Sequence, residues 1–251
     1  MRGRPWDTKR LLKLIVTSAT YRQSSRVAPA LQHRDPDNRL LARGPRYRLS
    51  ADVIRDQVLF ASGLLVEQVG GPSVKPYQPT GLAKELTGTE DFVQDHGTSL
   101  YRRSLYTFWK RTIAPPTLMT FDAANRETCV VRETRTNTPL QALNLMNDVT
   151  FVEAARVLAE RVMKKETTPD SRLALAWRLA AARPPSPAEL KILQAALAQH
   201  RAHYRQDQKA ALKLVSTGEA PRDRKLDLAE HAAFAAVCNL ILNLDEVITK
   251  E

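Results

Sequence analysis

Hydrophobic residues recur along most of the chain at intervals of three and four, which is the spacing of one face of a helix. The first such stretch runs from Trp6 to Tyr21 and predicts an amphipathic helix. Ser50 stands in the N-cap position before a second apolar stretch, and Gly70–Pro72 should stop the helix that begins there. A connector rich in proline and arginine separates these two predicted helices.

The last third of the chain predicts a helical bundle. Thr168 precedes Pro169 at the start of one helix, and Ser186 precedes Pro187 at the start of the next. Proline suits the first helical position because the N–H group that it lacks would have no partner there. The second of these helices should run to about Leu214, and a polar stretch then leads to a final apolar helix.

The middle of the chain gives a less regular pattern. Residues 70–96 are rich in proline and glycine and predict an ordered loop, whereas residues 99–112 fit either a helix or an extended segment. Val130 and Val131 form the centre of the best strand candidate, which would need part of residues 106–109 as its partner. The predicted fold class is mainly α: a multi-helix, bundle-like domain with long ordered loops of proline and glycine and at most a small β-hairpin.

One central motif, RTNTPLQALNLMND from Arg135 to Asp148, combines two signals of a helix start. Thr138 followed three residues later by Gln141 is a capping box, and Pro139 takes the first helical position. The helix should bend near Asp148 and then continue. These structural roles are sufficient to explain the three residues without any chemistry.

The length of 251 residues allows one large domain or two smaller ones. We expect a core domain over residues 1–165, which carries an arginine-rich loop, and a C-terminal helical subdomain over residues 166–251 that packs on it as one continuous unit. The apolar stretches are shorter than the roughly 18 to 20 residues that cross a bilayer, so no membrane span is predicted. Basic residues interrupt the first apolar stretch, so we expect no signal peptide in this chain.

Composition narrows the candidate partners. The formal net charge of +11 would suit a nucleic-acid-binding protein. The arginines are nevertheless spread over nearly every segment, which favours a solvated basic surface and argues against a nucleic-acid partner. Cys129 and Cys238 form neither a C-x-x-C nor a C-x-x-C-H motif, so we expect two buried free thiols, no metal site and no attached haem in this segment.

The candidate functional site is a polar cluster just before the central helix. It comprises five residues that could hold an anion or dock a partner: Asp122, Arg126, Arg132, Arg135 and Asn137. Arginine binds carboxylates through two parallel hydrogen bonds, so the main interpretation is an internal network of ion pairs that fixes the loop on the helix. The alternative is a cleft for a sulfate ester, a carboxylated sugar or a haem propionate. We assign no catalytic residue, because no paired base, nucleophile or metal-binding motif accompanies Asp122.

Six stretches of the chain carry a family resemblance. In chain order they are WDTKRLLKLIVTSATYRQSS, NRLLARGPRYRLSADVIRDQ, GGPSVKPYQPTGL, YRRSLYTFWKRT, FDAANRETCVVRETRTNTPLQALNLMND and LILNLDEVITKE. Together they closely resemble the planctomycete cytochrome-c-associated C-terminal domain, a family of unknown biochemical function. The resemblance covers almost the whole chain, and Ser216–Arg224 is its least distinctive part.

This resemblance implies a context and no particular reaction. Members of that family form the C-terminal part of large exported proteins, whose upstream region carries a cytochrome-like domain with C-x-x-C-H and a second helical domain. This chain has neither, so we expect it to be a fragment of a longer protein, with haem c bound only in the upstream domain. The expected localisation is the periplasm or the cell surface.

The leading hypothesis is therefore a non-catalytic accessory or interaction domain of an exported cytochrome-c-associated protein. Its partners would be the cytochrome-like and helical domains of the same polypeptide or complex. The competing hypothesis is an anion- or glycan-binding enzyme domain in polysaccharide breakdown, in which the arginine-rich loop holds an anionic glycan. No substrate can be named from the sequence.

Overall fold

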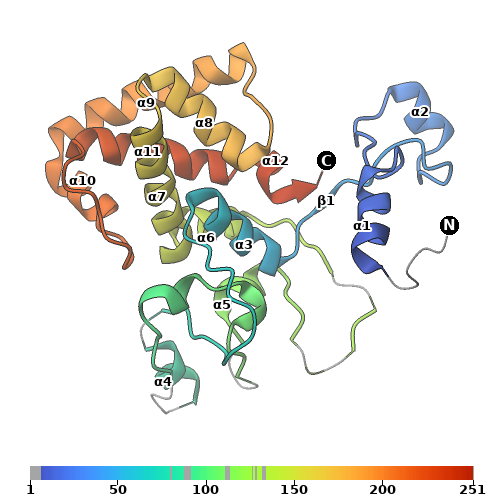
Figure 1. The fold of residues 1–251 in the computed structure, drawn as a ribbon, viewed down its shortest axis with the longest axis horizontal. Helices are drawn as coiled ribbons and strands as arrows, with labels where there is room; N and C mark the ends of the chain where they lie inside the picture. Colours follow the sequence, from blue (N-terminus) through green and yellow to red (C-terminus); the bar gives the residue numbers. More distant parts are fainter. Residues whose placement is uncertain are drawn as a thin grey trace. The chain divides into compact units, whose positions relative to one another are not determined.

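A computed structural model describes residues 7–79, 81–87, 92–110, 114–125, 127, 129–131 and 134–250. The chain divides into two compact units (Figure 1). The smaller one is the described part of Met1–Arg48 with Thr249 and Lys250, and the larger one is Leu49–Ile248. Helices dominate, which confirms the predicted mainly α class. The expected subdivision after residue 165 concerns the larger unit and stays a prediction.

The smaller unit contains two helices and one pair of short strands. Helix α1 (Thr8–Thr17) confirms the first predicted helix, and α2 (Pro29–Arg34) lies within the connector, where no helix was predicted. Strand β1 (Tyr47–Arg48) pairs in antiparallel fashion with β2 (Thr249–Lys250). Residues 47–48 and 249–250, about two hundred positions apart, therefore pair in this unit, which no local pattern could have shown.

The larger unit is a bundle built around α7 (Val149–Lys165) and α11 (Leu228–Leu242), which lie across each other (Figure 1). Helix α11 is apolar on nearly all sides, which is typical of a helix that is buried all round. Helices α3 (Ala51–Ser62), α8 (Pro169–Ala181) and α9 (Pro187–Gln206) pack against this centre. Among the fully buried side chains are Phe151, Leu158, Leu173, Phe234 and Ile241.

Two helices end earlier than predicted. Helix α3 begins after Ser50 as expected, but it ends at Gly63, which adopts the left-handed conformation with φ of 86°, before the predicted stop at Gly70. Glycine adopts this conformation without steric cost, so it is a common helix terminator. The helix predicted to reach Leu214 is interrupted at Asp207, whose carboxylate accepts the N–H of the third residue of a new helix, α10 (Gln208–Val215).

The central capping box is confirmed. Helix α6 (Pro139–Asn147) starts with Pro139, and the N–H of Thr138 donates to Oε1 of Gln141 at 3.3 Å. The predicted bend is a complete break, because Asp148 ends α6 and caps α7 by accepting the N–H of Thr150 at 2.8 Å. One residue therefore serves both helices.

The described residues in the middle of the chain form short helices, turns and single bridges. They include the short helices α4 (Leu82–Thr87) and α5 (Pro116–Thr120) and two 3₁₀ turns, η1 (Gly97–Tyr101) and η2 (Ser104–Tyr106). Single β-bridges join Val66 to Arg102 and Val74 to Thr107. A last short helix, α12 (Asp245–Ile248), precedes β2.

The predicted strand around Val130 and Val131 is wrong for the residues that the structure describes there. Neither valine lies in a strand, and both are exposed. A strand needs a partner and a face to bury, and the expected partner at residues 106–109 pairs with Val74 instead. The prediction of two buried thiols is half right, since Cys238 is buried and Cys129 is exposed.

No helix in the described part of the chain is both long enough and apolar enough to cross a bilayer.

Candidate functional site

Hydrogen bonds from Thr136 to Asp122 hold together the two ends of the segment from Asp122 to Asn137. Asp122 has a left-handed backbone with φ of 59°, and its carboxylate accepts the N–H of Thr136 at 2.8 Å and the hydroxyl of Thr136 at 2.9 Å. This aspartate therefore joins the two ends of the segment. The carboxylate of Asp122, which the sequence predicts as part of an anion or docking site, therefore has a structural role.

Gln141 does more than complete the capping box. Its side chain is buried, and Nε2 donates to the carbonyl of Thr120 at 3.0 Å and to the carbonyl of Thr136 at 3.3 Å. The same amide therefore ties the start of α6 to the end of α5 and to the returning segment. The sequence motif indicated the cap and gave no sign of these two tertiary contacts.

The five predicted site residues do not all fall within the described structure. Asp122 is half-buried, and Arg135 and Asn137 are exposed. Arg126 and Arg132 lie outside the described residues, as does Glu133, which the predicted ion-pair network would need. The structure thus places Asp122 against Thr136, and the gathering of arginines around an anion stays a prediction.

Asp148, an acid at the end of the central motif, also accepts hydrogen bonds from the chain. In addition to capping α7, it accepts the hydroxyl of Thr117 on α5 at 2.7 Å. The contact links α5 to the junction of α6 and α7. Both acids near the predicted site thus carry hydrogen bonds that hold the chain together.

In the described part of the larger unit, three arginines occupy buried positions that the sequence analysis did not single out: Arg55, Arg102 and Arg156. Each donates to main-chain carbonyl groups of loops. Arg55 on α3 binds the carbonyls of Leu100 at 2.6 Å and Arg102 at 2.9 Å, and the hydroxyl of Ser104 at 3.2 Å. Its guanidinium therefore fixes the two 3₁₀ turns on α3.

Arg102 also donates to main-chain carbonyls, in this case those of the loop after α3. It donates to the carbonyls of Pro72 at 2.8 Å and of Gly70, and it lies over the ring of Tyr106 with its guanidinium carbon 3.9 Å from the ring centroid. The hydroxyl of Tyr106 accepts the N–H of Gly70 at 2.8 Å. The carbonyl groups of the Gly70–Pro72 turn thus bind an arginine of the same chain.

The third arginine belongs to a buried pair on α7. Nη2 of Arg156 lies 3.3 Å from Oε1 of Glu153, and both side chains are 1% exposed. Arg156 also donates to the carbonyls of Thr217 at 2.7 Å and Ala220 at 2.5 Å, while Glu153 accepts the N–H of Ala220 at 2.7 Å. The pair holds the loop after α10 through its backbone.

Two tyrosines and a glycine complete the surroundings of Glu153. Tyr101 donates its hydroxyl to Oε1 of Glu153 at 3.0 Å. Burial, followed by the nearby charge of Glu153, raises the pKa of Tyr101 and of Tyr77 above the usual range of tyrosine. A methyl group at Gly218 would lie 2.1 Å from Cδ of Glu153, so this position has no room for a side chain.

A weak sequence signal for these buried charges existed. Arg55 directly follows Ile54 on the apolar side of α3, and Glu153 and Arg156 stand three residues apart within the apolar stretch of α7. A charged pair at this spacing on the buried face of a helix is costly unless it is fully hydrogen-bonded. Its presence there predicts a buried polar network, although the loops that complete the network cannot be identified from the sequence.

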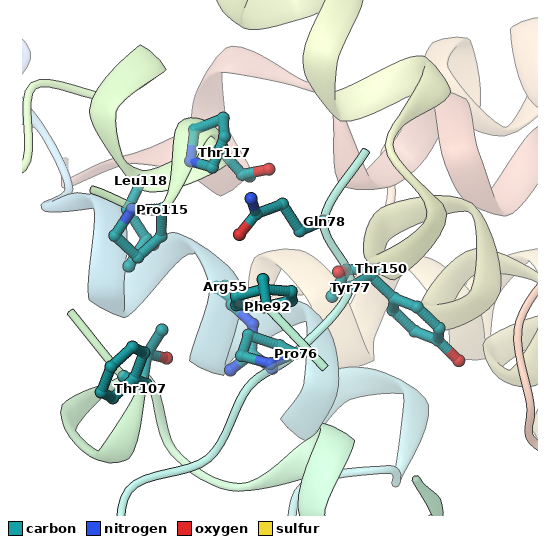
Figure 2. Close-up of a pocket in the computed structure, with 12 residues that line it drawn as sticks. Arg55, Pro76, Tyr77, Gln78, Phe92, Thr107, Pro115, Thr117, Leu118 and Thr150 are labelled. Carbon is teal, nitrogen blue, oxygen red and sulfur yellow. The ribbon is translucent and has the colours of Figure 1, made fainter. Parts of the chain in front are cut away.

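A small pocket lies beside Arg55 (Figure 2). It has an interior volume of about 20 Å³, and the residues that line it come from α3, α5, α7 and the loops around Tyr77 and Phe92. Figure 2 shows Gln78 reaching toward the centre, with Arg55, Thr107 and Pro115 around it. Hydroxyl groups of threonine and rings of proline and phenylalanine supply most of the remaining lining.

The histidines show no shared metal-binding geometry. His231 is buried and its Nε2 lies 3.0 Å from the carbonyl oxygen of Arg156, while Nδ1 of His96 lies 2.6 Å from Oε1 of Glu219. Burial lowers the pKa of His231. Within the described ranges, no three side chains of histidine, cysteine, aspartate and glutamate lie as a metal ion would need them.

Comparison with known proteins gives one family match. The family model described as "PSD1: Protein of unknown function (DUF1553)" matches residues 1–197, well over half of the chain. No curated protein and no solved structure matches the sequence.

Proposed function

The chain belongs to the PSD1 family of proteins of unknown function (DUF1553), and we propose that it is a non-catalytic accessory and interaction domain of an exported, cytochrome-c-associated protein. Its partners would be the cytochrome-like and helical domains of the same polypeptide or complex. Haem c would be bound in the upstream domain. This proposal rests on the family resemblance of the motifs and on one surface of α6.

The exposed row of aliphatic side chains on α6 carries the proposal. Leu140, Leu143 and Met146 follow one another at intervals of three along this short helix, and the first two are about 60% exposed. Neighbouring exposed aliphatic residues of this kind are typical of protein interaction surfaces. Arg135 and Asn137, both exposed, directly precede the helix and supply polar groups at its rim.

Internal hydrogen bonds of three acids and three buried arginines support the same interpretation. The carboxylates of Asp122, Asp148 and Glu153 all accept hydrogen bonds from the chain itself. The buried guanidinium groups of Arg55, Arg102 and Arg156 donate to loop carbonyls. Such groups hold a rigid scaffold on which an exposed helix can present a constant surface.

A binding measurement tests the proposal directly. The cytochrome-like and helical domains, produced as one polypeptide, should bind this chain saturably in isothermal titration calorimetry. Leu143→Asp should weaken the affinity about tenfold or more, because a charge would be buried at the centre of the interface. Leu212→Asp, a change at an exposed leucine of α10, is the matched control and should leave the affinity unchanged. The absence of binding, or an equal loss in both variants, would contradict the proposal.

The second candidate function is an anion- or glycan-binding enzyme domain, and the exposure of Arg135 beside Asn137 is the observation that favours it. The chain should then elute from heparin at higher salt than from duplex DNA, and Arg135→Glu should lower the eluting salt concentration. Glycan cleavage by the purified chain would decide for this candidate over the accessory role.

A further inference from the structure

The pocket of Figure 2 has hydrogen-bond donors among its lining residues. A guanidinium carries five N–H groups, and Arg55 uses three of them on Leu100, Arg102 and Ser104. Within the described residues, the remaining two have no partner. The hydroxyl of Thr107 is buried and makes no hydrogen bond in this part of the structure either. Buried polar groups nearly always have partners, so the Thr107 hydroxyl indicates that an acceptor can bind in this pocket.

The walls of the pocket are apolar. Phe92, Phe108, Pro76 and Pro115 are among the residues that line it. The interior volume of about 20 Å³ admits one or two atoms and no more. A ligand could therefore place an oxygen atom inside, while its body would rest on the aromatic and proline rings of the rim.

The charges around Arg55 favour an uncharged acceptor. Burial lowers the pKa of Arg55, and the carboxylates of Asp56, Asp148 and Asp52 act in the opposite direction. Three acids near one arginine already balance its charge, so an anion placed beside Arg55 would be repelled by them. Arg55 binds two main-chain carbonyls elsewhere, which are neutral acceptors of the required size.

We propose that this pocket binds a proline-containing peptide segment, one main-chain carbonyl of which accepts from Arg55 and Thr107. Extended proline-rich segments dock on surfaces lined by aromatic rings, and Phe92 and Phe108 line this pocket. The site is independent of α6, so its test can fail without affecting the proposed accessory function, and the reverse also holds.

Titration of the isotope-labelled full chain with the peptide acetyl-Ala-Pro-Ala-amide, followed by NMR, tests the proposal. The amide signals of Thr107 and Phe108 should shift saturably at millimolar peptide. Thr107→Val keeps the shape and removes the hydroxyl, so it should weaken binding about fivefold, the effect of one neutral hydrogen bond. Thr107→Ser restores the hydroxyl and should restore most of the affinity.

Three results would overturn the proposal. They are the absence of saturable shifts up to the solubility limit of the peptide, equal binding by Thr107→Val, and tighter binding of acetate at the same signals. If the valine variant does not fold, Phe108→Leu is the second variant to test. It removes an aromatic ring from the pocket wall and should also weaken binding. Unchanged affinity in this variant would contradict the proposal. N-methylacetamide, an amide without the proline ring, should bind more weakly than the peptide.

Discussion

Arginine has opposite roles in two regions of this molecule. In the bundle, Arg55, Arg102 and Arg156 are buried and donate to carbonyl groups of loops. In the segment before α6, Arg135 is exposed, and the segment is closed by Asp122 and Thr136. The region that looked richest in arginine chemistry is thus closed, in its described part, by an aspartate and a threonine, and the arginines that organise the fold lie elsewhere.

In this protein, burial determines whether an arginine has a structural role. A buried guanidinium is costly unless its N–H groups find acceptors, and loop carbonyls supply these acceptors at fixed positions. An exposed guanidinium is already hydrated and gains little from an ion pair. Local sequence does not distinguish the two situations, because burial depends on elements that are far away in the chain.

The largest expected effect comes from the buried pair. Arg156→Met should lower the free energy of unfolding by about 3 to 5 kcal/mol, because Glu153 would remain buried without its partner. Arg135→Met, the matched exposed substitution, should change it by no more than about 0.5 kcal/mol. Urea unfolding followed by circular dichroism measures both. Similar losses in the two variants would remove the distinction between the regions.

A smaller effect is expected at Gly218. Gly218→Ala should cost about 2 to 3 kcal/mol, because the residue has φ of 83° and an added methyl group would meet the carboxylate of Glu153. Gly70→Ala is the matched control, since that glycine has φ of 78° and nothing within 4 Å of an added methyl group. Its cost should be about 1 kcal/mol, from the backbone alone. Equal unfolding free energies for the two variants would show that the loop around Gly218 moves away from Glu153 at no cost.

The smallest effect is expected at Arg183, whose exposure lies between that of the buried arginines and that of Arg135. Its half-exposed guanidinium binds Glu189 at 2.7 Å and Glu246 at 2.6 Å, and the bond from Arg183, followed by the N–H of Ser186, lowers the pKa of Glu189 to about 2. A lowered folded-state pKa stabilises the protein above the unfolded value of 4.5, and this contribution is lost as the pH falls toward 2.

Glu189→Gln should therefore reduce the acid sensitivity of the protein. The urea midpoint should fall less between pH 5 and pH 2.5 in the variant than in the unchanged chain. Glu166→Gln removes a carboxylate outside this pair of ion bonds and serves as the control. Identical pH profiles for the unchanged chain and Glu189→Gln would show that Arg183 behaves as an ordinary surface residue.

Sequence patterns were reliable where the cause is local. The capping box at Thr138 and the proline starts at Pro169 and Pro187 depend on neighbouring backbone groups, and all are present. The early end of α3 at Gly63 was missed because several apolar residues follow it, which continued the helical pattern beyond the true terminus.

The candidate site was harder to predict because its important contacts are tertiary. Gln141 binds Thr120 and Thr136 in addition to its cap, and Glu153 meets a loop that begins more than sixty residues later. The strand expected at Val131 was wrong for the same reason. A strand forms only if distant residues pair with it, and the local sequence does not show whether they do.

The loop held by Arg156 has one further consequence for protein engineering. Thr217 and Ala220 contribute carbonyl oxygens and an N–H group to the contacts with the α7 pair, and every amino acid except proline offers the same groups. The hydrogen bonds to Glu153 and Arg156 therefore do not depend on the side chains at these two positions, whereas Gly218 between them must be left as it is.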